Sequence, residues 1–280
     1  MPMPTFAQIF SRKMELTDIL GYVGALVIGV VLGLIGGGGS ILTVPILVYL
    51  LAINPVTATA YSLFVVGFSS LVGAAKNFQK GRVNFKTAFY FSVPAFISVF
   101  STRKFLVPAI PEEIFSLSGF TLTRDVGIML FFAILMLAAA ASMILDKEKT
   151  FKDKDTSGDV NYLALIPLGL LTGIITGLVG SGGGFIIIPI LVLLAKLPMK
   201  TAIGTSLFII AINSLIGFLG DIGNINIHWT FLLIFTAISI SGIILGVYLN
   251  KIIDGKKLKK GFGWFVLLMG IYIIWKEISS

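Results

Sequence analysis

Long apolar stretches dominate the chain and are separated by short polar segments. Residues 19–75 contain no Asp, Glu, Lys or Arg, and the stretches 160–195 and 222–250 also lack these charged residues. One membrane-spanning helix needs about 20 apolar residues, so each stretch is long enough for at least one crossing. A β-barrel is excluded because its strands alternate polar and apolar residues over about 10 positions. The pattern predicts an all-α integral membrane protein.

Polar interruptions divide each half of the chain into five apolar segments. In the first half the segments are 19–36, 40–53, 57–76, 86–107 and 125–145. In the second half they are 161–180, 184–196, 200–220, 229–250 and 261–276. The second segment of each half lies at the lower limit for a crossing. It either spans a thinned region or forms a re-entrant hairpin with its predecessor, so we expect eight to ten membrane-embedded segments in total.

The two halves carry the same glycine-rich motif at the same register. Gly33 begins the sequence Gly-Leu-Ile-Gly-Gly-Gly-Gly, and Gly177 begins Gly-Leu-Val-Gly-Ser-Gly-Gly, 144 positions later. Each motif is followed by Pro-Ile-Leu-Val, which starts at Pro45 in one half and at Pro189 in the other. Hydrophobic segments that are interrupted at corresponding points of two halves indicate the binding site of a secondary transporter.

The distribution of Lys and Arg predicts that the two halves are inverted repeats. The loop after the third segment of the first half carries Lys76, Lys80, Arg82 and Lys86, whereas the equivalent loop, 220–230, carries no cation. After the fourth segment the bias reverses: residues 251–260 are rich in Lys, and their first-half counterparts are Arg103, Lys104 and Arg124. Because cations collect in cytoplasmic loops, equivalent loops face opposite sides and both termini are external.

This organisation gives a first repeat over 1–145, a charged cytoplasmic linker over 146–160 and a second repeat over 161–280. The segment 1–17 lacks the cleavage pattern of a signal peptide, so we expect the first apolar segment to be retained. The predicted location is the cytoplasmic membrane, crossed several times.

Each glycine cluster is followed by a helix that we expect to begin inside the membrane, at Ser40 or at Gly184. A helix start presents unpaired N–H groups and the positive end of the helix dipole, which favours an anion without any charged side chain. The third segment of each half adds polar side chains at helical spacing, with Ser70 and Ser214 beside them. The predicted substrate-binding residues are Gly37, Gly38, Gly39, Ser40, Ser62, Ser69, Gly182, Gly183, Gly184, Thr205, Ser206 and Asn213. The alternative interpretation is close helix packing with interhelical hydrogen bonds.

Composition narrows the chemistry further. The net charge of +8 would suggest a nucleic-acid partner in a soluble protein, but cytoplasmic loops explain it here. The chain has no cysteine, and it offers neither a carboxylate cluster for a metal nor a nucleophile–base pair in the membrane. We therefore expect no metal, no cofactor and no enzymatic activity. Lys76 and Asp221 are interpreted as interfacial residues at helix ends, and His228 as a helix cap or interfacial anchor.

The doubled motif resembles the TauE/SafE sulfite exporter family. In the first half the resemblance extends through Ala-Thr-Ala-Tyr-Ser, which ends at Ser62, and Gly-Arg-Val-Asn, which starts at Gly81. In the second half it extends through Ala-Ile-Gly-Thr-Ser-Leu, which starts at Ala202, and it covers residues 18–276 in all. The resemblance implies a permease that exports a small sulfur-containing anion, such as sulfite or an organosulfonate. We expect alternating access, with one repeat rocking against the other.

Three other functions remain open at this point. The first is a passive small-anion channel, and the second is an integral membrane enzyme acting on a lipid or peptide. A third class is a purely structural or assembly subunit, which predicts no flux and an obligate partner. Saturable flux with counterflow distinguishes a carrier from a channel. The sequence also leaves open the exact substrate, coupling to a proton or sodium ion, and assembly into a homo-oligomer.

Overall fold

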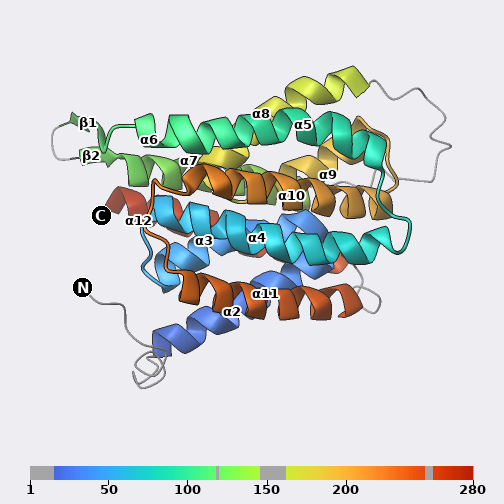
Figure 1. Ribbon diagram of the computed structural model, residues 1–280. Helices are drawn as coiled ribbons and strands as arrows, with labels where there is room; N and C mark the ends of the chain where they lie inside the picture. Colours follow the sequence, from blue (N-terminus) through green and yellow to red (C-terminus); the bar gives the residue numbers. More distant parts are fainter. Residues whose placement is uncertain (1–15, 118–119, 146–161, 250–254, 280) are drawn as a thin grey trace.

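A computed structural model describes residues 16–117, 120–145, 162–249 and 255–279, and almost all of them lie in helices that run along one common direction (Figure 1). Within these residues, six helices are long and apolar enough to cross a membrane. The predicted all-α membrane fold is therefore confirmed. The predicted linker, 146–160, and most of the N-terminal segment 1–17 lie outside the described residues.

The predicted apolar segments coincide with helices or with runs of consecutive helices. The first half contains α2 (Leu16–Ile35), the 3-10 helix η1 (Gly36–Leu42), α3 (Thr43–Pro45), the π-helix η2 (Ile46–Leu50), α4 (Pro55–Phe78), α5 (Phe85–Ser101), the π-helix η3 (Thr102–Leu106), α6 (Val107–Ala109) and α7 (Arg124–Ile144). The second half contains η4 (Tyr162–Ala164), α8 (Leu165–Val179), α9 (Gly184–Leu193), α10 (Met199–Asp221), α11 (Trp229–Leu249) and α12 (Gly255–Ser279).

Between α6 and α7 the chain forms a β-hairpin, which the sequence analysis did not predict. Strand β1 (Glu113–Leu117) pairs antiparallel with β2 (Phe120–Thr123). Thr123 ends the hairpin and caps α7, because its hydroxyl accepts a hydrogen bond from the N–H of Val126 at 3.3 Å. At the start of α7, Asp125 accepts a 2.6 Å hydrogen bond from the side-chain amide of Asn54, which itself caps α4. The hairpin is thus tied to the start of α4.

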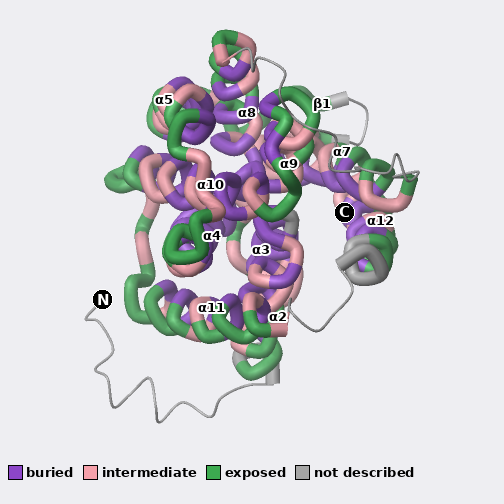
Figure 2. Tube along the Cα trace, turned by 90° about the vertical axis from the view of Figure 1, so that its right-hand side faces the viewer, coloured by how far each residue is buried: buried purple, intermediate pink, exposed green. Residues whose placement is uncertain are grey.

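The helices pair across the two halves of the chain. Helix α2 packs against α11, α5 against α8, α4 against α10, and α7 against α12. Figure 2 shows α4 and α10 at the centre, with α2 and α11 on one side and α5 and α8 on the other. The first predicted segment of each half thus pairs with the fourth segment of the other half. The third segments of the two halves pair with each other, and so do the fifth segments. The two halves are therefore interlocked.

Contacts at glycines give the relative directions of the paired helices. Gly29 and Gly33 of α2 lie against Gly242 and Gly246 of α11 in that order, so these two helices are parallel. In the central pair, by contrast, Gly67 of α4 contacts Leu215 and Gly73 contacts Leu207, so α4 and α10 are antiparallel. The loops that follow α4 and α10 consequently lie at opposite ends of the bundle.

The close approach of paired helices depends on the absence of side chains at these glycines. A Cβ at Gly242 would overlap the backbone of Leu26 and Gly29. On the other side of the bundle, a Cβ at Gly169 or Gly173 of α8 would overlap backbone carbonyls of α5. Lipid tails are as apolar as the side chains, so association of membrane helices relies on such close packing.

Cysteine labelling tests whether the two loops face opposite sides of the membrane. The natural chain has no cysteine, so Gln79→Cys after α4 and Asn226→Cys after α10 each introduce one thiol at an exposed position. In intact cells we expect a membrane-impermeant maleimide to label Asn226→Cys, and to label Gln79→Cys only after permeabilisation, because cations mark the cytoplasmic side. Labelling of both variants from the same side would contradict the inverted orientation.

Candidate functional site

The second glycine cluster breaks the chain between α8 and α9. Gly180, Gly182 and Gly183 have φ values of 71°, 69° and 69°, in the left-handed region that residues with a side chain rarely adopt. Helix α9 then begins at Gly184, the start that the sequence predicted. The first N–H groups of this helix have no partner within it. Because Gly180–Gly184 are buried, this helix start lies inside the protein.

The first glycine cluster has a different conformation. Gly36 has a φ of 75°, but the residues from Gly36 to Leu42 form the 3-10 helix η1, and α-helical structure resumes only at Thr43. Ser40 lies within η1, where its hydroxyl donates a 2.7 Å hydrogen bond to the carbonyl of Gly37. The expectation of a helix start at Ser40 is therefore wrong. Four consecutive glycines allow the tighter helix, whereas in the second cluster serine replaces one of them.

The two glycine clusters touch each other. A Cβ at Gly184 would overlap the backbone of Gly37, and a Cβ at Gly37 would overlap Gly184. Gly182 lies between α4 and α10: a Cβ there would be 2.9 Å from Val66 and 3.1 Å from the hydroxyl oxygen of Ser214. The clusters thus meet at the interface between the two halves, beside the central helix pair.

Four of the predicted polar residues hydrogen-bond within the protein. Besides Ser40, the hydroxyl of Ser69 donates to Ser239 of α11 at 3.0 Å, and Ser206 donates to the carbonyl of Ile203 at 2.9 Å. Thr205 accepts from the backbone N–H of Asn84, at the start of α5, at 2.9 Å. The bonds of Ser69 and Thr205 join different helices and correspond to the packing interpretation of the sequence motif, whereas those of Ser40 and Ser206 stay within their own helices.

Five buried polar side chains, on α4, on α10 and in the second glycine cluster itself, retain hydrogen-bonding capacity. The part of the chain that the structure describes offers no partner to the hydroxyls of Ser62, Ser70, Ser181 and Ser214 or to the side-chain oxygen of Asn213, and all five residues are at most 2% exposed. We call these five residues the polar cluster. Most buried polar groups in proteins are paired, so this concentration is unusual.

Helical spacing directs the polar cluster toward the second glycine cluster. Val66 lies four residues from both Ser62 and Ser70, and its side chain lies at Gly182. On α10, Ile210 also lies at Gly182, and Ser214 follows it by four residues. Residues four apart share a helix face, so we infer that both central helices turn hydroxyls toward the break, where Ser181 adds a fourth.

Gly36, Gly37 and Gly39 of the first cluster and Gly180–Gly184 of the second are buried. Two hollows on the described residues lie away from these clusters: one between α5 and α8, lined by Ser98, Phe105 and Ile174, and one on α12 at Trp275.

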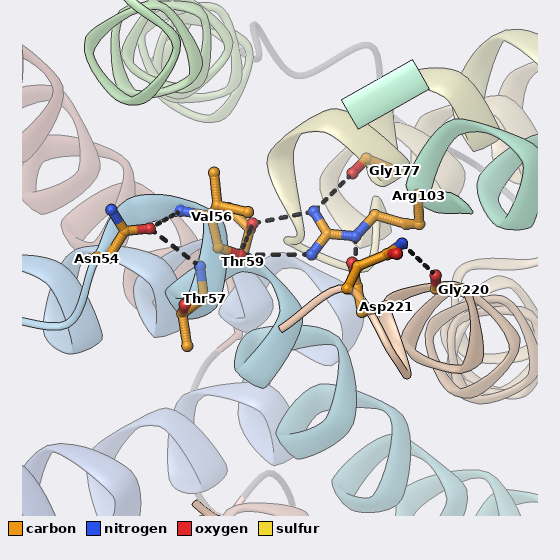
Figure 3. Close-up of polar contacts among 9 residues, drawn as sticks. Asn54, Val56, Thr57, Thr59, Arg103, Gly177, Gly220 and Asp221 are labelled. Atoms are coloured by element: carbon orange, nitrogen blue, oxygen red, sulfur yellow. Dashed lines mark hydrogen bonds and ion pairs between the residues drawn. The ribbon is translucent and has the colours of Figure 1, made fainter. Parts of the chain in front are cut away.

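A buried ion pair lies next to the second glycine cluster (Figure 3). Nε of Arg103 donates to a carboxylate oxygen of Asp221 at 2.7 Å, and the two side chains are 0% and 3% exposed. Nη1 of Arg103 donates to the hydroxyl of Thr59 at 3.0 Å and to the carbonyl of Gly177 at 3.1 Å. A longer bond of 3.5 Å joins Nη2 to the carbonyl of Val56. The guanidinium therefore connects α4, α8 and α10.

This pair corrects two interpretations of the sequence. Asp221 is not interfacial, and Arg103 does not belong to the loop after the fourth segment. The helical path continues from α5 through the π-helix η3 and into α6, which carries Arg103 into the bundle. The sequence could have revealed this position, because an Arg lies inside the apolar segment 86–107 and ionisable residues within membrane segments are functional candidates.

His228 is exposed, and its backbone N–H donates a 2.7 Å hydrogen bond to the hydroxyl of Tyr61.

Comparison with known proteins identifies the family. The family model of the sulfite exporter TauE/SafE matches residues 22–273. The chain belongs to the TauE/SafE family. It is 29% identical over 258 residues to a "Probable membrane transporter protein" of Xylella fastidiosa (strain Temecula1), covering 90% of this chain and 93% of the relative. It is 28% identical over 270 residues to "Probable membrane transporter protein YunE" of Bacillus subtilis, covering 91% and 96%.

A third relative comes from an archaeon. "Probable membrane transporter protein MJ0441" of Methanocaldococcus jannaschii is 26% identical over 285 residues, covering 95% of this chain and 97% of the relative. No solved structure matches the chain. Membership of the TauE/SafE family, together with the membrane-spanning helices, shows a multi-pass membrane protein of a transporter family.

Substitution of Gly184 tests the contact between the glycine clusters. In Gly184→Ala the added methyl overlaps the backbone of Gly37, and overpacking of this kind typically costs about 1–3 kcal/mol. We expect a clearly lower melting temperature of the purified protein in detergent. Gly261→Ala is the control, because a Cβ at Gly261 meets nothing within 4 Å. Equal melting temperatures for the two variants would show that the clusters are not in contact.

Proposed function

We propose that this TauE/SafE protein exports a small sulfur-containing anion, such as sulfite or an organosulfonate, by alternating access between two inverted repeats. The observation that carries the proposal is the polar cluster at the second glycine break. Ser214 of α10 and the start of α9 lie at this break, and Ser62 and Ser70 of α4 lie one turn on either side of Val66, which contacts Gly182. Hydroxyls and backbone N–H groups are donors that suit an oxyanion, and a helix start favours negative charge.

The arrangement of the helices supports movement of one half against the other. Equivalent central helices, α4 and α10, are antiparallel, and the first helix of each half packs against the fourth helix of the other. Inverted repeats produce this pattern, and in transporters of that kind the substrate lies at the repeat interface. The polar cluster occupies such an interface, and its five residues are buried.

Export of an anion is compatible with the membrane potential. Moving one negative charge out of a cell with a negative interior is favoured by about 2.3 kcal/mol per 100 mV. A uniporter with a neutral, hydrogen-bonding site therefore needs no additional energy source. The names of the relatives likewise describe membrane transporters.

Flux measurements on polar-cluster variants test the proposed site. In proteoliposomes loaded with labelled sulfite, Ser181→Ala and Ser214→Ala should each raise the half-saturating concentration at least about tenfold. That factor corresponds to a lost hydrogen bond to a charged group, about 1.5–3 kcal/mol. Ser241→Ala is the matched control, because this exposed serine bonds only its own helix, at the carbonyl of Ala237.

The same experiment separates the alternatives. Unlabelled sulfite on the opposite side should accelerate exchange in a carrier and have no such effect in a channel. If the half-saturating sulfite concentration is unchanged in both Ser181→Ala and Ser214→Ala, the polar cluster does not form the substrate site.

A further inference from the structure

The Arg103–Asp221 pair is costly to bury, and packing alone does not explain it. Withdrawing two charges from water costs several kcal/mol per ion, and replacing such a pair by apolar residues is often neutral or stabilising. Charged side chains within membrane segments therefore mark substrate pathways and relays more often than structural supports. Arg103 also lies in a π-helix, η3, and π-helical turns occur frequently at functional sites.

The ion pair has no counterpart at the positions related to it by the repeat. The register of 144 residues places Val247 opposite Arg103 and Asn77 opposite Asp221 in the repeat-related positions. Asn77 bonds within its own helix, at the carbonyl of Gly73, 2.9 Å away. A structural requirement common to both halves would be met in the same way at both ends, so the pair has a role specific to its end.

Arg103 lies close to the glycine break where we place the substrate. Its guanidinium contacts the carbonyl of Gly177, three residues before Gly180. A Cβ at Gly180 would overlap Thr59, whose hydroxyl also accepts from Arg103. The positive charge is therefore within about one helical turn of the break. It lies at the end that the cation distribution predicts to be external.

The chemistry of the pair suggests competition between two anions. A guanidinium presents a planar fork of donors that matches carboxylates and other oxyanions. In the described conformation Asp221 engages this fork through Nε, while Nη2 has only a long bond of 3.5 Å. A small oxyanion leaving the polar cluster carries the same charge and the same kind of acceptor oxygens as Asp221.

We propose that Arg103 is an anion-binding residue on the exit path and that Asp221 is its built-in competitor, which the departing anion displaces. This inference rests on the proposed export of an oxyanion. When no anion is present, Asp221 pairs with Arg103 and holds α4, α8 and α10 together at the external end. When an anion takes the guanidinium, this contact between the halves is released and the exit opens. Return of Asp221 then expels the anion.

The test compares variants of the pair in full-length protein, with sulfite as the probe. Asp221→Asn keeps the side-chain shape but removes the competing charge, so the half-saturating concentration should fall about tenfold and the maximal rate should fall as well. Arg103→Lys keeps the charge but loses the fork, so the half-saturating concentration should rise about tenfold. Lys104→Gln is the control, because this neighbouring cation is exposed and should leave both quantities unchanged.

A charge-swapped variant, Arg103→Asp combined with Asp221→Arg, distinguishes a binding role from a structural lock. We expect the swapped pair to restore the melting temperature but not saturable flux. Restored flux, or unchanged half-saturation in Asp221→Asn and Arg103→Lys, would overturn the proposal for Arg103. Absence of sulfite flux in the wild-type protein would instead contradict the proposed function. Sulfite-induced thermal stabilisation that is stronger in Asp221→Asn than in the wild type would then still support an anion site at Arg103.

Discussion

Backbone-to-backbone contact between the two halves of the chain is the constraint on which the structure depends. Glycines of α2 lie against glycines of α11, and Gly37 lies against Gly184 where the two motifs meet. In lipid, helices gain no hydrophobic free energy by leaving the bilayer for one another, so such close packing holds them together. Any movement that opens the interface must separate these surfaces, and the substrate pathway we propose follows them.

Polar groups in this interface are few, and their positions therefore carry information. The polar cluster places hydroxyls from α4 and α10 beside the start of α9, where a neutral site suits a small anion. Arg103 and Asp221 add a charged pair at one end. The two sites have separate roles in the account: hydrogen bonds in the centre select the anion, and a charge at the exit governs its release.

Sequence reasoning predicted the membrane fold because charged and turn-forming residues bracket the apolar segments. It also placed the start of α9 at Gly184, since glycines with positive φ are needed there. It did not predict the 3-10 helix at Ser40, because a run of four glycines is compatible with several backbone conformations. The partners of Ser69 and Thr205 lie on α11 and at the start of α5, and contacts between distant segments are not encoded in local spacing. The buried position of Arg103 was missed for the same reason, since its partners come from three other helices.

The central claim is that the transported anion binds between the two halves, at Ser181 and Ser214. The most direct measurement is a crystal structure of the protein soaked with selenite, an analogue of sulfite whose selenium scatters anomalously. We expect an anomalous peak within hydrogen-bonding distance of both serine hydroxyls. Selenite that is transported but gives a peak only outside the interface between α4, α9 and α10 would contradict it.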